Sequence, residues 1–239
     1  MKEEYWVIRS GRYGIGIDEE VIGTMQPDQL PEGIKLEYFY NANPRHEITL
    51  KTVQVCRSLV TAAAFQAFVE ATGFETLAEK EHWGWVWEKG WTKREGVSWR
   101  NPFGDEADVL YRENTGQLPV LQLCWNDAEA YCDWLTTQLP KLPGLPPKLV
   151  RDWRVTLPSE AEWERAARGT DGRIYPWGAK FDPDKANTSE TGIGDTSAVG
   201  CFPAGANPLG LLDASGNVWE WTRSLWGKDW EKPEFVYPY

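Results

Sequence analysis

The chain has 239 residues, of which 41% are hydrophobic, 26% charged and 13% aromatic, and its formal net charge at neutral pH is −11. This composition is typical of a globular protein with one large domain or two small ones. The acidic excess argues against nucleic acid and against anionic membrane surfaces as partners, because both require a surplus of Lys and Arg.

The sequence shows no apolar run of about eighteen residues that could span a membrane. Its start, MKEEYWVIRS, lacks the apolar centre of a signal peptide, so we expect a cytoplasmic protein. The histidines, His46 and His82, are too few for a multi-histidine metal site. The cysteines show neither a C-x-x-C pair nor a zinc spacing, and we expect reduced, partly buried thiols at Cys56, Cys124, Cys132 and Cys201.

The first predicted elements are extended. Residues 5–17 alternate as strand, turn and strand, with Gly11 and Gly14 as candidates for the turn. Residues 46–56 predict a further strand, because their apolar side chains nearly alternate.

A helix is predicted next, with Thr61 as its N-cap and Gly73 just beyond its end. Its buried face is formed by apolar residues at helical spacing: Phe65, Phe68 and Val69. Residues 81–103 then carry five tryptophans, and alternation puts three of them on one face of an extended segment: Trp83, Trp85 and Trp87. This face is either packed on the core or forms the wall of a groove.

Residues 119–135 predict a strand that runs into a helix, with Asn126 as the cap and Glu129 completing a capping box. The buried face of that helix is predicted at Tyr131, Trp134 and Leu135. The triplet from Trp125 to Asp127 is similar to the calcium-binding triplet of sugar-binding lectins, but a helix start explains it equally well. The proline-rich residues 139–149 predict a loop.

The clearest helical signal is LPSEAEWERAARG, where Ser159 is the N-cap, Glu162 completes the capping box and Gly169 ends the helix. No helical period follows it, and Gly, Pro, Asn and Asp dominate residues 169–217. Such a long irregular stretch inside a compact domain is usually functional. A bound cation is the simplest way to organise it.

The stretch LLDASGNVWEWT contains two carboxylates, Asp213 and Glu220, in an otherwise apolar setting. In an extended segment the carbonyls of Gly216 and Val218 point to one side, beside the Glu220 carboxylate, and Asp213 can reach back across the turn. Hard oxygen ligands in an irregular set suit calcium. The alternative is that Glu220 pairs with an arginine and Asp213 caps a turn.

Several blocks together make the chain resemble the formylglycine-generating enzyme family, also called the sulfatase-modifying-factor domain. In chain order they are NPRHEITL, VTAAAFQAFVEATG, PVLQLCWNDAEAYCDWL, VTLPSEAEWERAARG, YPWG and ANTSETGIGDTSAVGCFPAGANPLGLLDASGNVWEWT. The resemblance covers nearly all of the chain from about residue 44. It implies one α+β domain over residues 1–239, a variant of the C-type-lectin-like fold with little regular secondary structure.

The resemblance also implies structural calcium. It carries the family's calcium loop onto four residues of this chain: Asp213, Gly216, Val218 and Glu220. A second calcium is implied near Asn187 and Thr188, with either Glu190 or Asp195 completing the site.

Members of this family continue past the position of Tyr239, with a GGSW-type strand, a GFR-type strand and, in true oxidases, two reactive cysteines that bind copper. We therefore expect a domain that is incomplete at its C-terminus, with no catalytic residue and no copper site of its own. Sulfoxide synthases with this fold use an iron domain that carries a histidine motif. The two histidines of this chain are too few to form that motif. Variable proteins of diversity-generating retroelements use the same fold for display without catalysis.

Two functions stay open. The first is a non-catalytic binding or display module, stabilised by calcium, for a protein or peptide ligand. The second is a copper-dependent oxidase of a protein cysteine whose catalytic cysteines lie outside this chain. A third interpretation is compatible with the first: the end EKPEFVYPY exposes large apolar groups, so a second polypeptide segment is expected to complete the fold.

Overall fold

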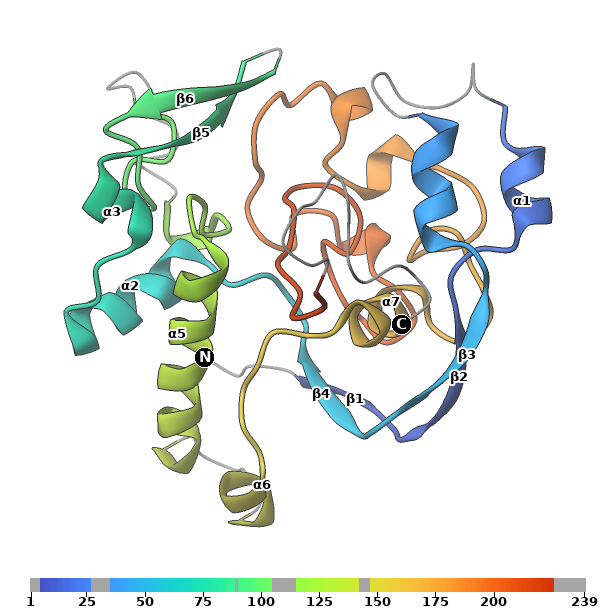
Figure 1. The fold of residues 1–239 in the computed structure, drawn as a ribbon, viewed down its shortest axis with the longest axis horizontal. Helices are drawn as coiled ribbons and strands as arrows, with labels where there is room; N and C mark the ends of the chain where they lie inside the picture. Colours follow the sequence, from blue (N-terminus) through green and yellow to red (C-terminus); the bar gives the residue numbers. More distant parts are fainter. Residues whose placement is uncertain (1–4, 27–34, 89, 105–114, 142–146, 226–239) are drawn as a thin grey trace.

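The computed structural model describes residues 5–26, 35–88, 90–104, 115–141 and 147–225. It is an α+β structure in which short helices and two-stranded sheets alternate with long irregular stretches (Figure 1). Its α-helices are α1 Glu19–Thr24, α2 Ala62–Thr72, α3 Leu77–Glu81, α5 Trp125–Gln138, α6 Pro147–Asp152 and α7 Glu160–Arg168. Its strands are β1 Tyr5–Ile8, β2 Gly11–Ile15, β3 His46–Leu50, β4 Val53–Cys56, β5 Trp83–Trp87 and β6 Trp91–Glu95. Short 3-10 turns cover Leu36–Ala42, Thr115–Gln117, Leu139–Lys141, Pro183–Lys185, Ser189–Thr191 and Pro203–Gly205.

The first four strands form one bent antiparallel ribbon. β1 pairs with β4 and β2 with β3, and Ile8 lies opposite Val53 while Gly11 lies opposite Leu50. Two residues separate the paired segments on each side, so the register continues unchanged through the bend. The strands were predicted, but the turn was placed wrongly: Gly11 lies in β2 and pairs, so the bend falls before it.

The predicted helix α2 is confirmed at both ends. The Thr61 hydroxyl accepts a hydrogen bond from the Ala64 N–H at 3.2 Å. Gly73 ends the helix in the left-handed conformation, with φ of 68°, which glycine adopts without a steric penalty. The side chains of Phe65 and Phe68 are buried against Tyr131 of α5, so the helical spacing located the core face correctly.

The start of α5 differs from the prediction. Cys124, not Asn126, is the N-cap, and the Asp127 carboxylate accepts the Cys124 N–H at 2.9 Å. Asp127 also accepts the Leu77 N–H of α3 at 3.2 Å, so a tertiary contact fixes the acid at this position. The loop predicted for 139–149 is also partly wrong, because α6 begins at Pro147, a residue whose fixed φ suits the first turn of a helix.

Helix α7 begins and ends as predicted. Ser159 and Glu162 form the reciprocal capping box, and Gly169 follows the last helical residue. Beyond it, residues 169–225 form turns and single 3-10 turns, as the Gly- and Pro-rich sequence indicated.

The buried apolar side chains of the described residues form three clusters, of which the smallest joins Ile15 and Leu50 of the ribbon to Ala161 of α7. One of the two larger core clusters joins Ile8 of the ribbon to Ala166 of α7 and to Leu211. The other joins Phe65 of α2, Trp99 and Tyr131 of α5. In Figure 1 the elements of the two clusters lie on opposite sides of the irregular 200–225 segment. The core is therefore divided, and the division positions the candidate site.

Among the described helices, none is long and apolar enough to cross a membrane. The terminal stretch EKPEFVYPY, on which the expected need for a covering segment was based, lies outside the described residues.

Candidate functional site

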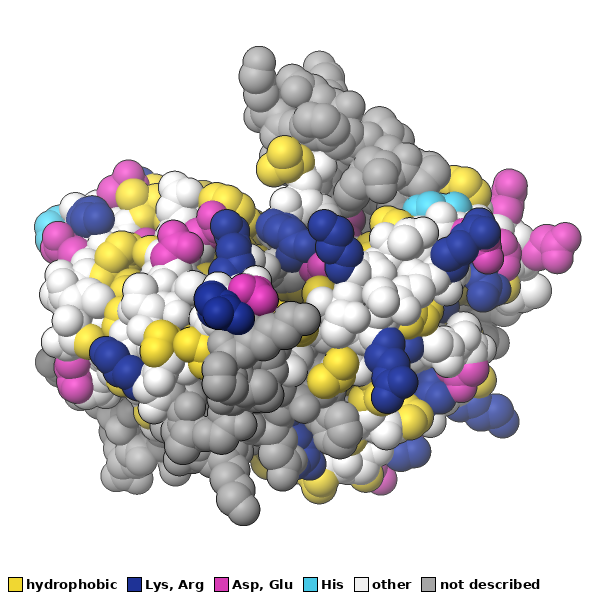
Figure 2. Space-filling model, turned by 90° about the horizontal axis from the view of Figure 1, so that it is seen from below, with side chains coloured by type: hydrophobic (Ala, Val, Ile, Leu, Met, Phe, Trp, Pro, Cys, Tyr) yellow, Lys and Arg dark blue, Asp and Glu magenta, His cyan; other side chains and the backbone are white. Residues whose placement is uncertain are grey.

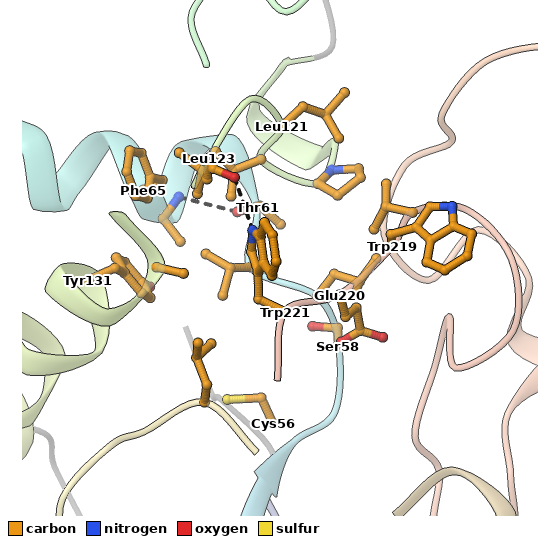
Figure 3. A pocket seen from close by; sticks show the side chains of 18 of the residues that line it. Cys56, Ser58, Thr61, Phe65, Leu121, Leu123, Tyr131, Trp219, Glu220 and Trp221 are labelled. Atoms are coloured by element: carbon orange, nitrogen blue, oxygen red, sulfur yellow. Dashed lines mark hydrogen bonds between the residues drawn. The ribbon is translucent and has the colours of Figure 1, made fainter. Parts of the chain in front are cut away.

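A cavity of about 2270 Å³ lies between the two core clusters. Val55, Trp163 and Leu211 line it from the ribbon and α7 side, and Phe65 and Tyr131 line it from the α2 and α5 side. Figure 3 shows Phe65, Leu123 and Tyr131 on one side of Trp221, Ser58 and Glu220 on the other, and Cys56 below it. Cavities that hold a drug-sized ligand measure roughly 300–1,000 Å³, so this one has room for a polypeptide segment.

Tryptophans of the β5–β6 hairpin form one wall of the cavity. Trp85, Trp87 and Trp91 are 51%, 66% and 62% exposed. Between them on β5, Gly84 and Val86 are the buried residues that face the core. The alternation along β5 was predicted correctly. The exposure of these tryptophan side chains favours the interpretation that they form a groove wall over the interpretation that they pack on the core.

The segment of residues 211–225 crosses the cavity and is held by indole groups at both sides. Trp221 Nε1 donates to the Leu123 carbonyl at 3.0 Å, and Trp125 Nε1 donates to the Thr222 carbonyl at 2.9 Å. On the α7 side, Trp163 Nε1 donates to Glu220 Oε1 at 3.0 Å. Three tryptophans therefore hold this segment, one through its backbone and two through its side chains.

An ion pair between the exposed Arg223 and the buried Glu162 fixes the end of the same segment. The Arg223 guanidinium binds both oxygens of Glu162, at 2.7 and 2.8 Å, and the Arg223 N–H donates to the Pro158 carbonyl at 2.8 Å. Burial acts to raise the pKa of Glu162, but hydrogen bonds from Arg223 and Ser159 leave that pKa below its usual value. Arg223, the arginine nearest to Glu220 in the sequence, thus pairs with Glu162 of the α7 capping box, and the hydrogen bond to the Glu220 carboxylate comes from Trp163.

The two carboxylates of the predicted calcium loop lie close enough to repel each other. Burial raises the pKa of Glu220 to about 7, against the lowering effect of the Trp163 hydrogen bond, and the charge of Asp213 adds to the rise. Glu220 is open to the cavity on one side while protein surrounds it on the others. Burial also raises the pKa of Asp213, whose Oδ2 accepts the Gly200 N–H at 2.7 Å.

The loop of residues 213–220 contacts the segment of the second predicted calcium site at Gly216. Asp213 lies at a φ of 53° and Gly216 at 80°. A Cβ on Gly216 would lie 2.2 Å from the Asn187 carbonyl oxygen. Because glycine has no Cβ, Gly216 of the first predicted calcium site can contact Asn187 of the second. The Gly216 carbonyl accepts one bond, from the Val218 N–H at 3.0 Å, which leaves its second lone pair.

Among the described residues, no three His, Cys, Asp or Glu side chains are arranged to hold a metal. A site here must draw on backbone carbonyls as well. Asp213, Gly216, Val218 and Glu220 offer two carboxylates with raised pKa values and two carbonyls, a set that fits calcium better than magnesium. This assignment stays a prediction.

The second predicted calcium site fits less well. The Thr188 carbonyl already accepts two bonds from Thr191, from its N–H at 3.2 Å and from its hydroxyl at 2.7 Å. The Asn187 amide donates to the Asp195 carbonyl at 2.8 Å. The Thr188 carbonyl is therefore engaged locally, but the buried Thr188 hydroxyl oxygen has no hydrogen-bond partner among the described residues.

Sequence reasoning missed Asn217, which holds the two loops together. Its N–H donates to the Asn187 carbonyl at 2.8 Å, and its side-chain amide bonds both backbone groups of Ser197 at 3.0 and 3.2 Å. Its φ is 67°, a conformation that asparagine tolerates better than most residues. The dipeptide Gly216-Asn217 was the available signal, since both residue types favour this region of conformational space.

Two thiols on the cavity wall, those of Cys124 and Cys132, have raised pKa values. Burial raises the pKa of Cys132 to about 11, and the charges of Glu129 and Asp133 add to the rise. Burial also raises the pKa of Cys124. Because the thiolate is the form that attacks substrates and binds metals, neither thiol is activated.

The charged residues around the cavity are mainly acidic. Its lining holds the carboxylates Glu81, Asp152, Glu162, Asp195 and Glu220 and the guanidinium groups Arg57, Arg154 and Arg223. On the face drawn in Figure 2, acidic and basic side chains are interspersed, and hydrophobic side chains reach the surface between them. The acidic lining and the net charge of −11 favour a neutral or basic ligand.

The profile of the sulfatase-modifying factor enzyme 1-like domain matches residues 2–237 of the chain. The formylglycine-generating enzyme of Mus musculus is 32% identical over 215 residues, which cover 77% of this chain and 52% of that protein. The inactive C-alpha-formylglycine-generating enzyme 2 of Bos taurus is 33% identical over 210 residues, which cover 76% of this chain and 62% of that protein. The chain thus spans about half to three fifths of the length of these relatives.

Among solved structures, PvdO from Pseudomonas aeruginosa matches with a TM-score of 0.61 and 24% identity. The match covers 94% of this chain and 71% of PvdO. At this identity the likeness speaks for the fold alone.

Proposed function

Since the chain belongs to the sulfatase-modifying factor enzyme 1-like domain family, we propose that it is a non-catalytic binding module for a protein or peptide ligand. The family includes enzymes, such as the formylglycine-generating enzymes and a hercynine oxygenase, as well as inactive paralogues. Membership of the family therefore does not decide between catalysis and binding, and the proposal rests on the features of this chain.

The cavity between the two core clusters carries the proposal. Its volume of about 2270 Å³ exceeds that of drug-sized ligand sites, and its walls present exposed tryptophans. Tryptophan is enriched among residues that dominate binding energy at protein interfaces. A ligand of polypeptide size would bury the tryptophan wall and join the two clusters.

The calcium loop supports this role as a structural element. Asp213, Gly216, Val218 and Glu220 would hold the ion, which supplies the positive charge that two facing carboxylates need. The segment that crosses the cavity would then be fixed at its start by calcium and at its end by the Arg223–Glu162 pair. The same arrangement would serve the display role known for retroelement variable proteins.

Binding of a synthetic peptide tests the proposal. A ten-residue peptide of alternating Val and Lys should bind, as measured by calorimetry, and a Val and Glu peptide of equal length should bind more weakly because the cavity lining is acidic. Trp85→Ala, which removes a ring from the cavity wall, should weaken binding of the Val and Lys peptide at least about tenfold.

Ile174→Ala is the matched control, because Ile174 is 49% exposed against 51% for Trp85 and lies outside the cavity lining. It should leave the affinity unchanged. Absence of peptide binding, or equal effects of the two substitutions, would contradict the proposed function.

The second candidate function is oxidation of a protein cysteine with copper, and the names of relatives such as the mouse enzyme favour it. We expect residues 1–239 alone to leave a sulfatase-type cysteine peptide unchanged in the presence of copper and oxygen. The reason is that the two reactive cysteines expected from the family resemblance lie outside these residues, and that burial raises the pKa values of Cys124 and Cys132. Mass spectrometry of the peptide checks this, and formylglycine formation would establish catalysis by this chain.

A further inference from the structure

The turn that follows α7 contains the sole Asp-Gly dipeptide of the chain, Asp171-Gly172, and the sequence has no Asn-Gly dipeptide. Both residues are exposed, and Gly172 lies in the left-handed region with φ of 71°. Because glycine has no side chain to shield its backbone nitrogen, this nitrogen can approach the carboxyl carbon of a preceding aspartate. The dipeptide is therefore a place where the backbone can rearrange.

The rearrangement joins the side chain of Asp171 to the next peptide nitrogen. The Gly172 nitrogen bonds to the Asp171 Cγ, the bond from Cγ to its hydroxyl oxygen breaks, and the amide proton leaves with the hydroxyl as water. Addition of water to the resulting succinimide restores aspartate or gives isoaspartate, in which the main chain runs through Cγ. The protonated carboxyl is the reactive form, because it loses water, whereas the carboxylate would have to expel an oxide ion.

The structure holds the Asp171 carboxylate in a clamp of two hydrogen bonds. Arg173 donates from Nε to Oδ1 at 2.8 Å and from Nη2 to Oδ2 at 2.5 Å. The Arg173 side chain is 17% exposed, and its Nη1 donates to the Pro176 carbonyl at 2.9 Å, which fixes the guanidinium. The hydrogen bonds and the charge of Arg173 lower the pKa of Asp171 to about 2. A fixed bidentate pair is the geometry in which a surface ion pair has a measurable effect.

The backbone after Asp171 is held by Arg168 of α7. Arg168 Nε donates to the Arg173 carbonyl at 2.8 Å and Nη2 to the Gly172 carbonyl at 3.4 Å. Its Nη1 donates to the carbonyl of Gly16, just beyond β2, at 3.2 Å. Isoaspartate adds one carbon to the main chain before the first two carbonyls, so isomerisation would displace them from Arg168 and loosen the turn from β2.

We propose that Asp171-Gly172 is a site of spontaneous backbone isomerisation and that Arg173 slows this reaction in the folded protein. Arg173 restrains rotation of the Asp171 carboxyl toward the Gly172 nitrogen, and its charge disfavours the protonated carboxyl that reacts. Arg173 is thus a positioning residue that protects the backbone of an exposed turn. The turn lies outside the cavity lining, so isomerisation and ligand binding are separate properties.

Incubation of the full chain at mildly acidic pH, below its unfolding temperature, tests the proposal. Digestion and chromatography with mass spectrometry measure isoaspartate, which changes retention but not mass. A synthetic peptide of residues 169–175 gives the rate without the folded turn. Arg173→Met should isomerise at least about fivefold faster than the wild-type protein, because the pKa of Asp171 returns from about 2 towards 3.8. A change of one in pKa alters the protonated fraction about tenfold, and solvent screening of an exposed pair reduces the full effect.

Two further variants separate the clamp from a general loss of structure. Arg173→Lys keeps the positive charge but loses the two parallel hydrogen bonds, so its rate should lie between those of the wild-type protein and Arg173→Met. Arg12→Met is the matched control, because Arg12 forms an exposed ion pair with Glu47 at the same distance of 2.5 Å. It should leave the rate at Asp171 unchanged. All rates are compared at a temperature at which circular dichroism shows each variant to be folded.

The outcomes distinguish the site from its protection. A wild-type rate equal to that of the peptide, or equal rates for the wild-type protein and Arg173→Met, would overturn the protective role of Arg173. Absence of isoaspartate in the peptide and in every variant would overturn the site itself. Wild-type protein isomerised at Asp171 and separated by chromatography should unfold at a lower temperature than unmodified protein, and an unchanged temperature would contradict the link through Arg168 to β2.

Discussion

Removal of calcium is expected to lower the midpoint of thermal unfolding of the protein by about 5–10 °C. A ligand present at a hundred times its dissociation constant stabilises the native state by about 2.7 kcal/mol. Each kcal/mol shifts the midpoint of a domain of this size by about 2–4 °C. The expectation follows from the repulsion between Asp213 and Glu220, which raises the pKa of Glu220 beyond the effect of burial. Calorimetric scans with calcium and with chelator would measure the shift.

Glu220→Gln tests whether the negative charge of Glu220 is needed for the response to calcium. The amide oxygen of glutamine can still accept the Trp163 indole hydrogen bond, while the negative charge is lost. We expect the variant to lose the response to calcium and, in chelator, to be at least as stable as the wild-type protein. Glu95→Gln, at an exposed acid of β6 that belongs to neither predicted calcium site, is the control. A full calcium response of Glu220→Gln would show that the ion binds elsewhere.

The stability of the calcium-free protein is expected to depend on pH through the Glu220 carboxyl. The pKa of Glu220 is raised in the native state to about 7, so the native state holds a proton that the unfolded chain releases between roughly pH 4.3 and 7. The contribution of this carboxyl therefore falls as the pH rises through that window and is constant above it. Calcium binding requires the ionised carboxylate and strengthens over the same window.

Local sequence signals located the helices whose ends are set by neighbouring residues. Thr61 with Gly73, and Ser159 with Glu162, act within a few residues of the backbone groups they bond. The start of α5 was misplaced because Asp127 also bonds the backbone of Leu77, fifty residues away. The helix α6 was missed because its proline-rich sequence resembles a loop, although proline at a first helical position favours a helix.

The residues of the candidate site were predictable, but their arrangement was not. The spacing in LLDASGNVWEWT places Asp213 and Glu220 in one loop, and the structure couples their charges. The partners of that loop come from distant segments: Asn187, Trp163 and Gly200. The cavity results from the division of the core into two clusters, a property of packing between elements that no periodicity in the sequence records.

Asn207→Ala is expected to destabilise the protein by about 3–5 kcal/mol, in the range caused by breaking a buried hydrogen-bond network. Asn207 is 4% exposed and joins the end of α7 to the turn that leads into the predicted calcium loop. Its amide donates to the carbonyls of Ala166 and Ala167, and its oxygen accepts the N–H groups of Leu209 and Leu211, each at 3.0 Å. Alanine leaves these backbone groups without their partner, at about 1–3 kcal/mol for each one that water cannot reach.

Urea unfolding of the purified variant measures this loss, with Asn126→Ala as the control. Asn126 is an exposed asparagine at the start of α5, whose cap is Cys124, so its replacement should change the free energy of unfolding by less than about 0.5 kcal/mol. Asn207→Asp adds a second comparison, because aspartate keeps the acceptor oxygens, loses the donor and places a charge beside two carbonyls. We therefore expect its stability to fall further as the pH rises above the pKa of the new carboxyl. A loss below about 1 kcal/mol for Asn207→Ala at an unchanged urea slope would show that water replaces the amide and that the link between α7 and the calcium loop is not set by this side chain.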